Sequence, residues 1–146
     1  MTDQDQREAV VAAARSWIGT PYHSGAKIKG VGVDCAQILA MVYPEAGVRA
    51  PIEVGKYSAQ WHLHSTIPLY EEAIVANGGK RVPAPTGIGD LVLYFQGKQF
   101  AHGAIITRVS PLRFVHAFAP ARRVVEGDET EFGVLISEDK KFFTLW

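Results

Sequence analysis

The chain has 146 residues, of which 47% are apolar and 21% are charged, proportions typical of one folded domain with a single core. Fifteen basic and fifteen acidic residues cancel, which argues against nucleic-acid and membrane-surface binding. The single cysteine excludes an internal disulfide and a cysteine-rich zinc site. Residues 1–6 are polar and no apolar run reaches membrane-spanning length, so we expect synthesis in a cytoplasm without a signal peptide.

The N-terminal segment predicts a helix followed by a turn. Apolar residues recur at helical spacing over residues 5–18, and Gly19 is expected to end this helix. The residues predicted to share its buried face are Val10, Ala13, Ala14, Trp17 and Ile18. Residues 19–25 are rich in turn-forming types and lead toward the cysteine.

The cysteine is predicted to open a second helix. Residues 30–33 alternate glycine and valine, which disfavours a helix, and Asp34 is a good N-cap. An apolar stripe of helical period follows, and Pro44 and Gly47 close the helix. Cys35 is therefore expected in the first turn, where unpaired N–H groups and the helix dipole favour a thiolate. On this segment alone, an inert buried cysteine is an equal alternative.

The middle of the chain predicts a loop and then a third helix. Residues 48–65 show no clear period, and loops of this length in a compact domain tend to be functional. Ser65 can cap a third helix over residues 66–77, which the glycines after it end.

From Gly87 onward the pattern changes to short β-runs. The candidate strands are residues 91–95, 102–107, 112–118, 122–125, 133–136 and 142–146. Helices followed by an antiparallel sheet predict an α+β fold, and the absence of a linker or repeat predicts one domain over residues 1–146.

Two of these strands carry histidines that are predicted to meet. Strands 102–107 and 112–118 predict a hairpin with a three-residue loop. If paired residue numbers sum to 218, His102 faces His116 on an apolar face, whereas a slip of one residue separates them. With Cys35 they can form a Cys–His–His arrangement. The alternative is that either histidine is a hydrogen-bonded core residue.

Several short motifs, in the same order along the chain, resemble those of the NlpC-type, papain-like cysteine peptidases, which cut bacterial cell-wall peptides. They are Trp17-Ile-Gly-Thr-Pro-Tyr22, Val33-Asp-Cys-Ala36, Gly89-Asp-Leu-Val92, Ala101-His-Gly-Ala-Ile105 and Phe114-Val-His-Ala117. Residues 57–64 are also similar to a segment of the short, phage-associated branch. The resemblance implies a papain-like fold in which N-terminal helices pack on a C-terminal antiparallel sheet or open barrel.

The resemblance also implies site residues. Cys35 corresponds to the nucleophile, His102 to the general base and His116 to the third residue that orients the base. Tyr22 and Asp34 correspond to residues that line the substrate site, where the tyrosine can assist the oxyanion and the aspartate can hold a substrate amine. Packing alone for Tyr22 and a helix cap alone for Asp34 are the alternatives.

Two departures from the family pattern bear on substrate preference. Gln37 replaces a residue that is usually small, and residues 23–27 replace a segment that is commonly glycine-rich. Trp61 is a candidate substrate-binding residue in the wall of the groove, together with His62 and His64, and a bare surface loop is the alternative.

We therefore expect thiol catalysis without a cofactor or metal, directed at the amide bonds of peptidoglycan stem peptides. The resemblance favours the γ-D-glutamyl to diamino-acid bond and allows phage tail proteins as partners, with action on the cell wall from a virion or after release. Three alternatives stay open: an amidase or acyltransferase on another substrate, a non-catalytic virion component that binds the wall, and a zinc site at His62 and His64.

Overall fold

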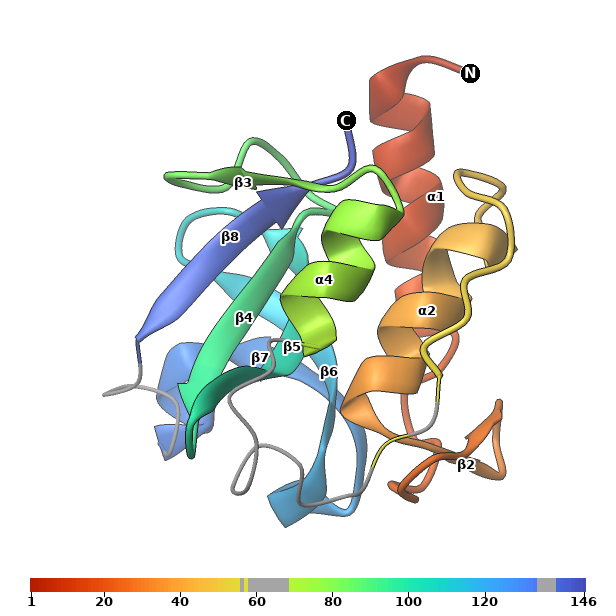
Figure 1. Cartoon of the computed structure of the whole chain (residues 1–146), viewed down its shortest axis with the longest axis vertical. Coiled ribbons are helices and arrows are strands. Elements are labelled where there is room, and N and C mark those ends of the chain that lie inside the picture. Colours follow the sequence, from red (N-terminus) through yellow and green to blue (C-terminus); the bar gives the residue numbers. More distant parts are fainter. Residues whose placement is uncertain (56, 58–68, 134–138) are drawn as a thin grey trace.

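The computed structural model describes residues 1–55, 57, 69–133 and 139–146. In this part of the chain, helices α1 (Asp3–Arg15), α2 (Cys35–Glu45) and α4 (Leu69–Ala76) lie on one side of an antiparallel sheet (Figure 1). The predicted α+β class is therefore confirmed. None of the helices in these ranges combines the length and apolar character that a membrane crossing requires.

The main sheet has six strands in the order β3-β8-β4-β5-β6-β7. Their bounds are β3 (Lys80–Val82), β4 (Leu91–Gln96), β5 (Gln99–Arg108), β6 (Arg113–Phe118), β7 (Arg123–Asp128) and β8 (Lys140–Thr144). A two-stranded hairpin, β1 (Lys27–Ile28) and β2 (Gly32–Val33), precedes α2, and the short 3-10 turns η1 (Ala119–Ala121) and η2 (Glu129–Glu131) flank β7. The sequence predicted the long strands to within a few residues but missed β1, β2 and β3. Residues 134–136 of the predicted strand 133–136 lie outside the described residues.

Helix α1 begins and ends earlier than predicted. Thr2 and Asp5 form a reciprocal capping box, and the helix therefore starts at Asp3. The helix ends at Arg15, so Trp17 is buried from the turn that follows rather than from the helix. Ile18 was predicted on the buried face, and this was wrong because it lies beyond the helix and is 47% exposed. The third predicted helix, residues 66–77, corresponds to α4, which is described from Leu69 to Ala76. Its predicted cap Ser65 lies outside the described residues.

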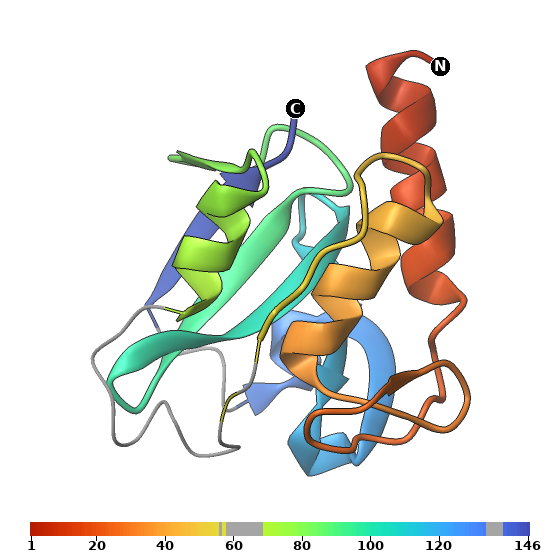
Figure 2. The same cartoon turned by 45° about the vertical axis from the view of Figure 1, so that its right-hand side comes forward.

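The sheet separates two apolar clusters. The larger cluster joins the three helices to one face of the sheet, through residues such as Leu93, Ile105 and Phe143. The smaller one lies on the other face and is rich in aromatic side chains. Its buried members are Val92, Tyr94, Ala104, Ile106, Phe114, Phe118 and Phe132. Figure 2 shows the helices together on the side of the larger cluster.

The register of β5 and β6 differs from the predicted one by two residues. Ile105 pairs with Val115 and Ile106 with Phe114, so paired numbers sum to 220 rather than 218. His102 pairs instead with Tyr94 of β4. Because side chains alternate along a strand, a shift of two keeps His102 and His116 on the same face as diagonal neighbours. The predicted meeting of the two histidines survives the register error for this reason.

A β-bulge in β5 decides where His102 points. Tyr94 pairs with His102 and Phe95 with Phe100, which leaves Ala101 as the extra residue of β5. Phe100 accordingly packs toward the helices, whereas His102 contacts Tyr94 and Phe118 of the other cluster. Gly103 follows, and a Cβ at this position would come within 2.6 Å of Leu39, so glycine is needed for α2 to pack this closely on β5.

A buried ion pair ties α1 to the start of β4. Arg7 donates to the carboxylate of Asp90 at 3.0 Å, and Asp90 is fully buried. The same carboxylate accepts hydrogen bonds from Thr86 and from the backbone N–H of Gly87. The guanidinium of Arg7 also lies 4.2 Å from the ring centroid of Trp146, so one side chain joins the helix, the sheet and the C-terminal residue.

Replacing Asp90 with alanine is expected to lower the free energy of unfolding by about 3–5 kcal/mol, because the Arg7 guanidinium would stay buried without its partner. Urea denaturation followed by circular dichroism measures the loss. The matched control is Lys29→Ala, which removes the partly exposed pair with Glu45 and should cost about 1 kcal/mol or less. Equal small losses in the two variants would contradict the structural role given to Asp90.

Candidate active site

Asp34 is the N-cap of α2, as predicted, and it is also the centre of a larger hydrogen-bond network. One carboxylate oxygen accepts from the backbone N–H of Ala36 at 3.1 Å and of Gln37 at 2.8 Å. The other accepts from the N–H of Gly25 at 2.7 Å and from the hydroxyl of Tyr57. Only 2% of Asp34 is exposed. Four donors of the chain thus engage the carboxylate, and its contact with a substrate amine stays a prediction.

Cys35 occupies the first turn of α2, where the sequence placed it. The hydroxyl of Tyr70, from the first turn of α4, donates to Sγ at 2.8 Å. Sγ itself lies 3.8 Å from the carbonyl oxygen of Ala101, the bulged residue of β5, and can donate to it. The thiol is therefore held between two helices and the sheet. Sequence reasoning missed Tyr70, and the one available signal was that a buried tyrosine hydroxyl needs a partner.

Tyr22 is brought to the thiol by backbone pairing on both sides. Its N–H donates to the carbonyl of Arg122 at 2.9 Å, and Tyr22 also forms a bridge with Val33 of β2. Arg122 has a positive φ of 62°, a conformation that costs a non-glycine residue energy and turns the chain at the end of η1. Burial, followed by the neighbouring Cys35 and Asp34, raises the pKa of Tyr22, so its hydroxyl stays protonated and can donate.

Gln37, the residue that departs from the family pattern, belongs to the same network. It is buried on α2, and its side chain reaches the hydroxyl of Tyr57, which in turn donates to Asp34. The buried amide of Gln37 thereby finds a hydrogen-bond partner in Tyr57. This gives the replacement a structural reason.

His102 and His116 form a direct hydrogen bond. Nε2 of His102 and Nδ1 of His116 lie 2.7 Å apart, with ring centroids at 5.0 Å. His116 is fully buried, stacked on Phe118 and edge-on to Phe132. When Nε2 of His102 donates this bond, the lone pair on its Nδ1 is left to accept a proton. This is the arrangement that a general base with an orienting partner requires.

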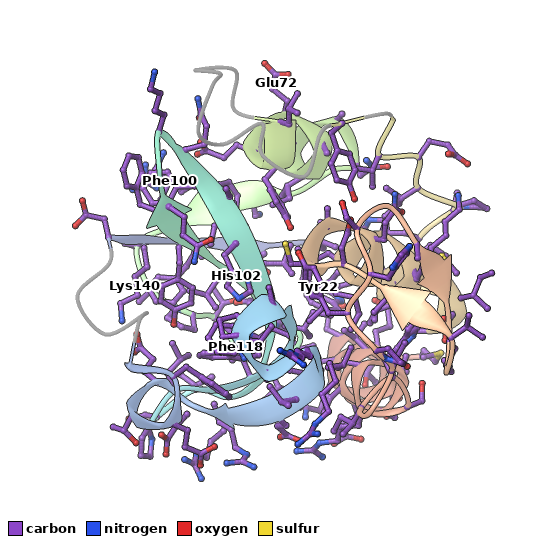
Figure 3. All side chains as sticks on the ribbon, turned by 90° about the horizontal axis from the view of Figure 1, so that it is seen from below. Tyr22, Glu72, Phe100, His102, Phe118 and Lys140 are labelled. Carbon is purple, nitrogen blue, oxygen red and sulfur yellow. The ribbon has the colours of Figure 1, made fainter. Side chains whose placement is uncertain are left out.

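The thiol and the imidazole pair approach each other at the bulge of β5. Sγ contacts the carbonyl of Ala101, and His102 is the next residue. Among the described residues, no hydrogen bond joins Sγ to either histidine ring. Figure 3 looks onto this end of the molecule, where Tyr22 and His102 lie near the centre of the view. The structure thus places His102 one residue beyond the carbonyl that Sγ contacts, and the catalytic pairing of the thiol with this imidazole stays a prediction.

The resting protonation states are neutral. Burial raises the pKa of Cys35 to about 11, and the hydrogen bond from Tyr70 opposes this shift. Burial lowers the pKa of His102 to about 4, and burial together with the neighbouring His102 lowers that of His116. The sequence predicted that the helix start favours a thiolate. That expectation is not met, because desolvation outweighs the donors around Sγ.

The remaining predicted residues are not among those that the structure describes. Trp61, His62 and His64 fall outside the described residues, so the groove wall and the zinc alternative stay predictions. Within the ranges that the structure covers, no three His, Cys, Asp or Glu side chains gather closely enough to hold a metal ion.

No family model matches the chain, and no curated protein sequence does so either. Solved structures do match. The NlpC/p60 domain of the peptidoglycan hydrolase SagA is 24% identical with a TM-score of 0.62, and the match covers 92% of this chain and 96% of that one. This chain has the NlpC/p60 fold.

Two further structures with this fold extend the likeness at lower identity. The peptidoglycan hydrolase RipB from Mycobacterium tuberculosis is 19% identical with a TM-score of 0.60, covering 99% of this chain and 68% of that one. An N-acetylmuramoyl-L-alanine amidase from Bacteroides uniformis is 11% identical with a TM-score of 0.60, covering 94% and 97%. The NlpC/p60 fold confirms the predicted papain-like architecture.

The alkylation rate of Cys35 by iodoacetamide is expected to rise about tenfold per pH unit between pH 7 and pH 10, because only the thiolate reacts and its pKa is about 11. Intact-mass spectrometry at timed intervals measures the rate. Tyr70→Phe should slow alkylation further at each pH, since it removes a donor to the thiolate. The urea-unfolded chain is the control, and its alkylation rate should level off once the pH passes the ordinary thiol pKa of about 8.5. A rate that is constant from pH 6 to pH 9 would instead indicate a preformed thiolate–imidazolium pair.

The free energy of unfolding is expected to fall as the pH drops from 6.5 toward 4. The unfolded histidines take up protons near pH 6.5, whereas folded His102 does so only near pH 4, so protons favour the unfolded chain in this window. Each buried histidine contributes up to about 1.4 kcal/mol per pH unit. Urea denaturation at pH 7 and pH 5 measures the slope, and His116→Phe should flatten it. Equal stability at the two pH values would contradict the burial of uncharged rings.

Proposed function

We propose that this protein hydrolyses amide bonds of peptidoglycan stem peptides by thiol catalysis, with Cys35 as nucleophile, His102 as general base and His116 as the residue that orients the base. The observation that carries the proposal is the bond between Nε2 of His102 and Nδ1 of His116, one residue along β5 from the carbonyl that Sγ of Cys35 contacts. It occupies one nitrogen of His102 and leaves the other for the thiol.

In this mechanism the proton moves during the attack and not before it. The thiol and the imidazole are both neutral at rest, so Nδ1 of His102 takes the proton of Sγ as sulfur bonds to the carbonyl carbon. The imidazolium then protonates the leaving amine, and water hydrolyses the thioester. Catalytic hydrogen bonds are often long in ligand-free enzymes and tighten when substrate binds, so this mechanism does not require a bond between Sγ and the ring in the free protein.

The start of α2 supplies a donor for the oxyanion. Asp34 takes the N–H groups of Ala36 and Gln37, and the N–H of Cys35 is left to point toward the attacked carbonyl oxygen. The protonated hydroxyl of Tyr22 is a second candidate donor. Both groups come from segments fixed by backbone pairing, as a preorganised oxyanion site requires.

The substrate class rests on the sequence resemblance and on the named neighbours with the same fold, two of which are peptidoglycan hydrolases. Within the stem peptide we propose the γ-D-glutamyl to diamino-acid bond. The amidase among the neighbours makes the bond between the sugar and the peptide the competing position.

Digestion of purified peptidoglycan, with the products identified by mass spectrometry, tests this function. The native chain should release fragments cut within the stem peptide, and Cys35→Ala should release none. His116→Ala should keep a reduced rate, lower by about tenfold to a hundredfold, because it loses the orientation of His102 and not the base itself. Release of the same fragments by Cys35→Ala would disprove the nucleophile, and free sugar chains with intact stem peptides would indicate an amidase.

A second candidate function is binding of the cell wall without cleavage. The observation that favours it is the neutral thiol, which has no hydrogen bond to an imidazole among the described residues. Co-sedimentation with insoluble peptidoglycan, measured beside the digestion, separates the two functions: a wall-binding component sediments and releases no fragments. Association with a phage tail stays a prediction of the sequence resemblance alone.

A further inference from the structure

An apolar cavity of about 60 Å³ lies between α2 and α4, and we name it the α2–α4 pocket. Leu39 and Tyr43 of α2 form one wall, and Tyr70, Ala73 and Ile74 of α4 form the other. Val54, from the segment that follows α2, closes it on a further side. Both helices begin at the same end of the molecule, so the pocket runs along their length from that end (Figure 1).

The pocket adjoins the thiol. Ala36, the residue after Cys35, lines it, and so does Tyr70, whose hydroxyl donates to Sγ at 2.8 Å. The pocket therefore lies beside the thiol, separated from it by one residue of α2 on one side and in contact with its hydrogen-bond donor on the other. The proposed peptide mechanism does not use this space.

The chemistry of the walls defines what the pocket can accept. Of the described residues that line it, none carries a charge, and apolar side chains make up nearly the whole surface. The amide of Asn77, at the other end of α4, already donates to the carbonyl of Ala73. A buried carboxylate or ammonium group would find no partner here and would be strongly disfavoured. The volume suits roughly four water-sized groups, and hence an alkyl chain of about four carbons.

We propose that the α2–α4 pocket is an acyl subsite for an uncharged aliphatic chain of about four carbons, carried by esters or amides whose carbonyl Cys35 attacks. This activity goes beyond cleavage of the charged stem peptide, and it rests on the proposed role of Cys35 as nucleophile. Sγ passes its proton to His102 and bonds to the carbonyl carbon, and the bond to the leaving alcohol or amine breaks as that group takes the proton. Water then splits the thioester into the free acid and the thiol.

The test compares p-nitrophenyl butanoate with p-nitrophenyl acetate, following nitrophenolate release and the mass of the acylated chain. The two extra methylene groups of butanoate should raise kcat/KM by about tenfold in the native chain, because the pocket buries them. Ala73→Leu fills the pocket and should abolish this preference while the acetate rate is kept. Ala76→Leu is the matched control, since it makes the same change at an exposed position of the same helix and should leave the preference intact.

The possible outcomes distinguish failure of the acyl subsite from failure of the proposed function. Equal kcat/KM for the two esters, or equal effects of Ala73→Leu and Ala76→Leu, would overturn the acyl subsite even if peptidoglycan is digested. Acylation of Cys35 by neither ester would overturn it as well. Ester cleavage that persists in Cys35→Ala would count against both the subsite and the nucleophile. Thermal melts of the two leucine variants establish that each is folded.

Discussion

The carboxylate of Asp34 is the constraint on which the rest of the site depends. It closes the first turn of α2, receives the backbone of residue 25 and holds the hydroxyl of Tyr57, so three segments are fixed relative to one buried group. Cys35 follows directly and has little freedom of its own. The cap uses the next two N–H groups of the helix, those of Ala36 and Gln37. One helix cap thus fixes the start of α2 with Cys35, the turn at Gly25 and the side chain of Tyr57 relative to one another.

Aromatic packing and a single hydrogen bond, rather than a helix cap, hold His102 and His116 in place. His116 is surrounded by phenylalanine rings that offer no hydrogen bond, so its bond to His102 is the polar contact that fixes both rings. Nε2 of His116 has no hydrogen-bond partner among the described residues, and such a buried polar atom is costly in hydrocarbon. The aromatic shell keeps the pair uncharged and in one orientation. The packing that orients the two imidazole rings therefore also lowers their pKa values.

The sequence predicted correctly those features that depend on residues close together in the chain. The cap at Asp34, the helix that starts at Cys35 and the strands with alternating apolar residues all depend on near neighbours, and they were predicted. The β5–β6 register was not predicted, since β5 carries irregularities in its ladders with both β4 and β6, and no local sequence pattern indicates them. Tyr70 could not be assigned to the thiol for the same reason: it comes from a separate helix whose placement depends on tertiary packing. The raised pKa of Cys35 likewise follows from burial, and a helix-start motif does not indicate how buried the thiol will be.

The bond between the Tyr70 hydroxyl and the thiol has a consequence for chemical durability. Attack by peroxide begins at the thiolate, and with a pKa of about 11 only roughly one molecule in ten thousand carries that form at pH 7. Although Cys35 is only partly buried, a thiol with so high a pKa should therefore advance to the sulfenic acid more slowly than an ordinary exposed cysteine. With one cysteine in the chain, no second thiol is present to repair such damage by forming a disulfide. The same desolvation that raises the pKa of the thiol would in this way protect the chain's one cysteine from oxidation.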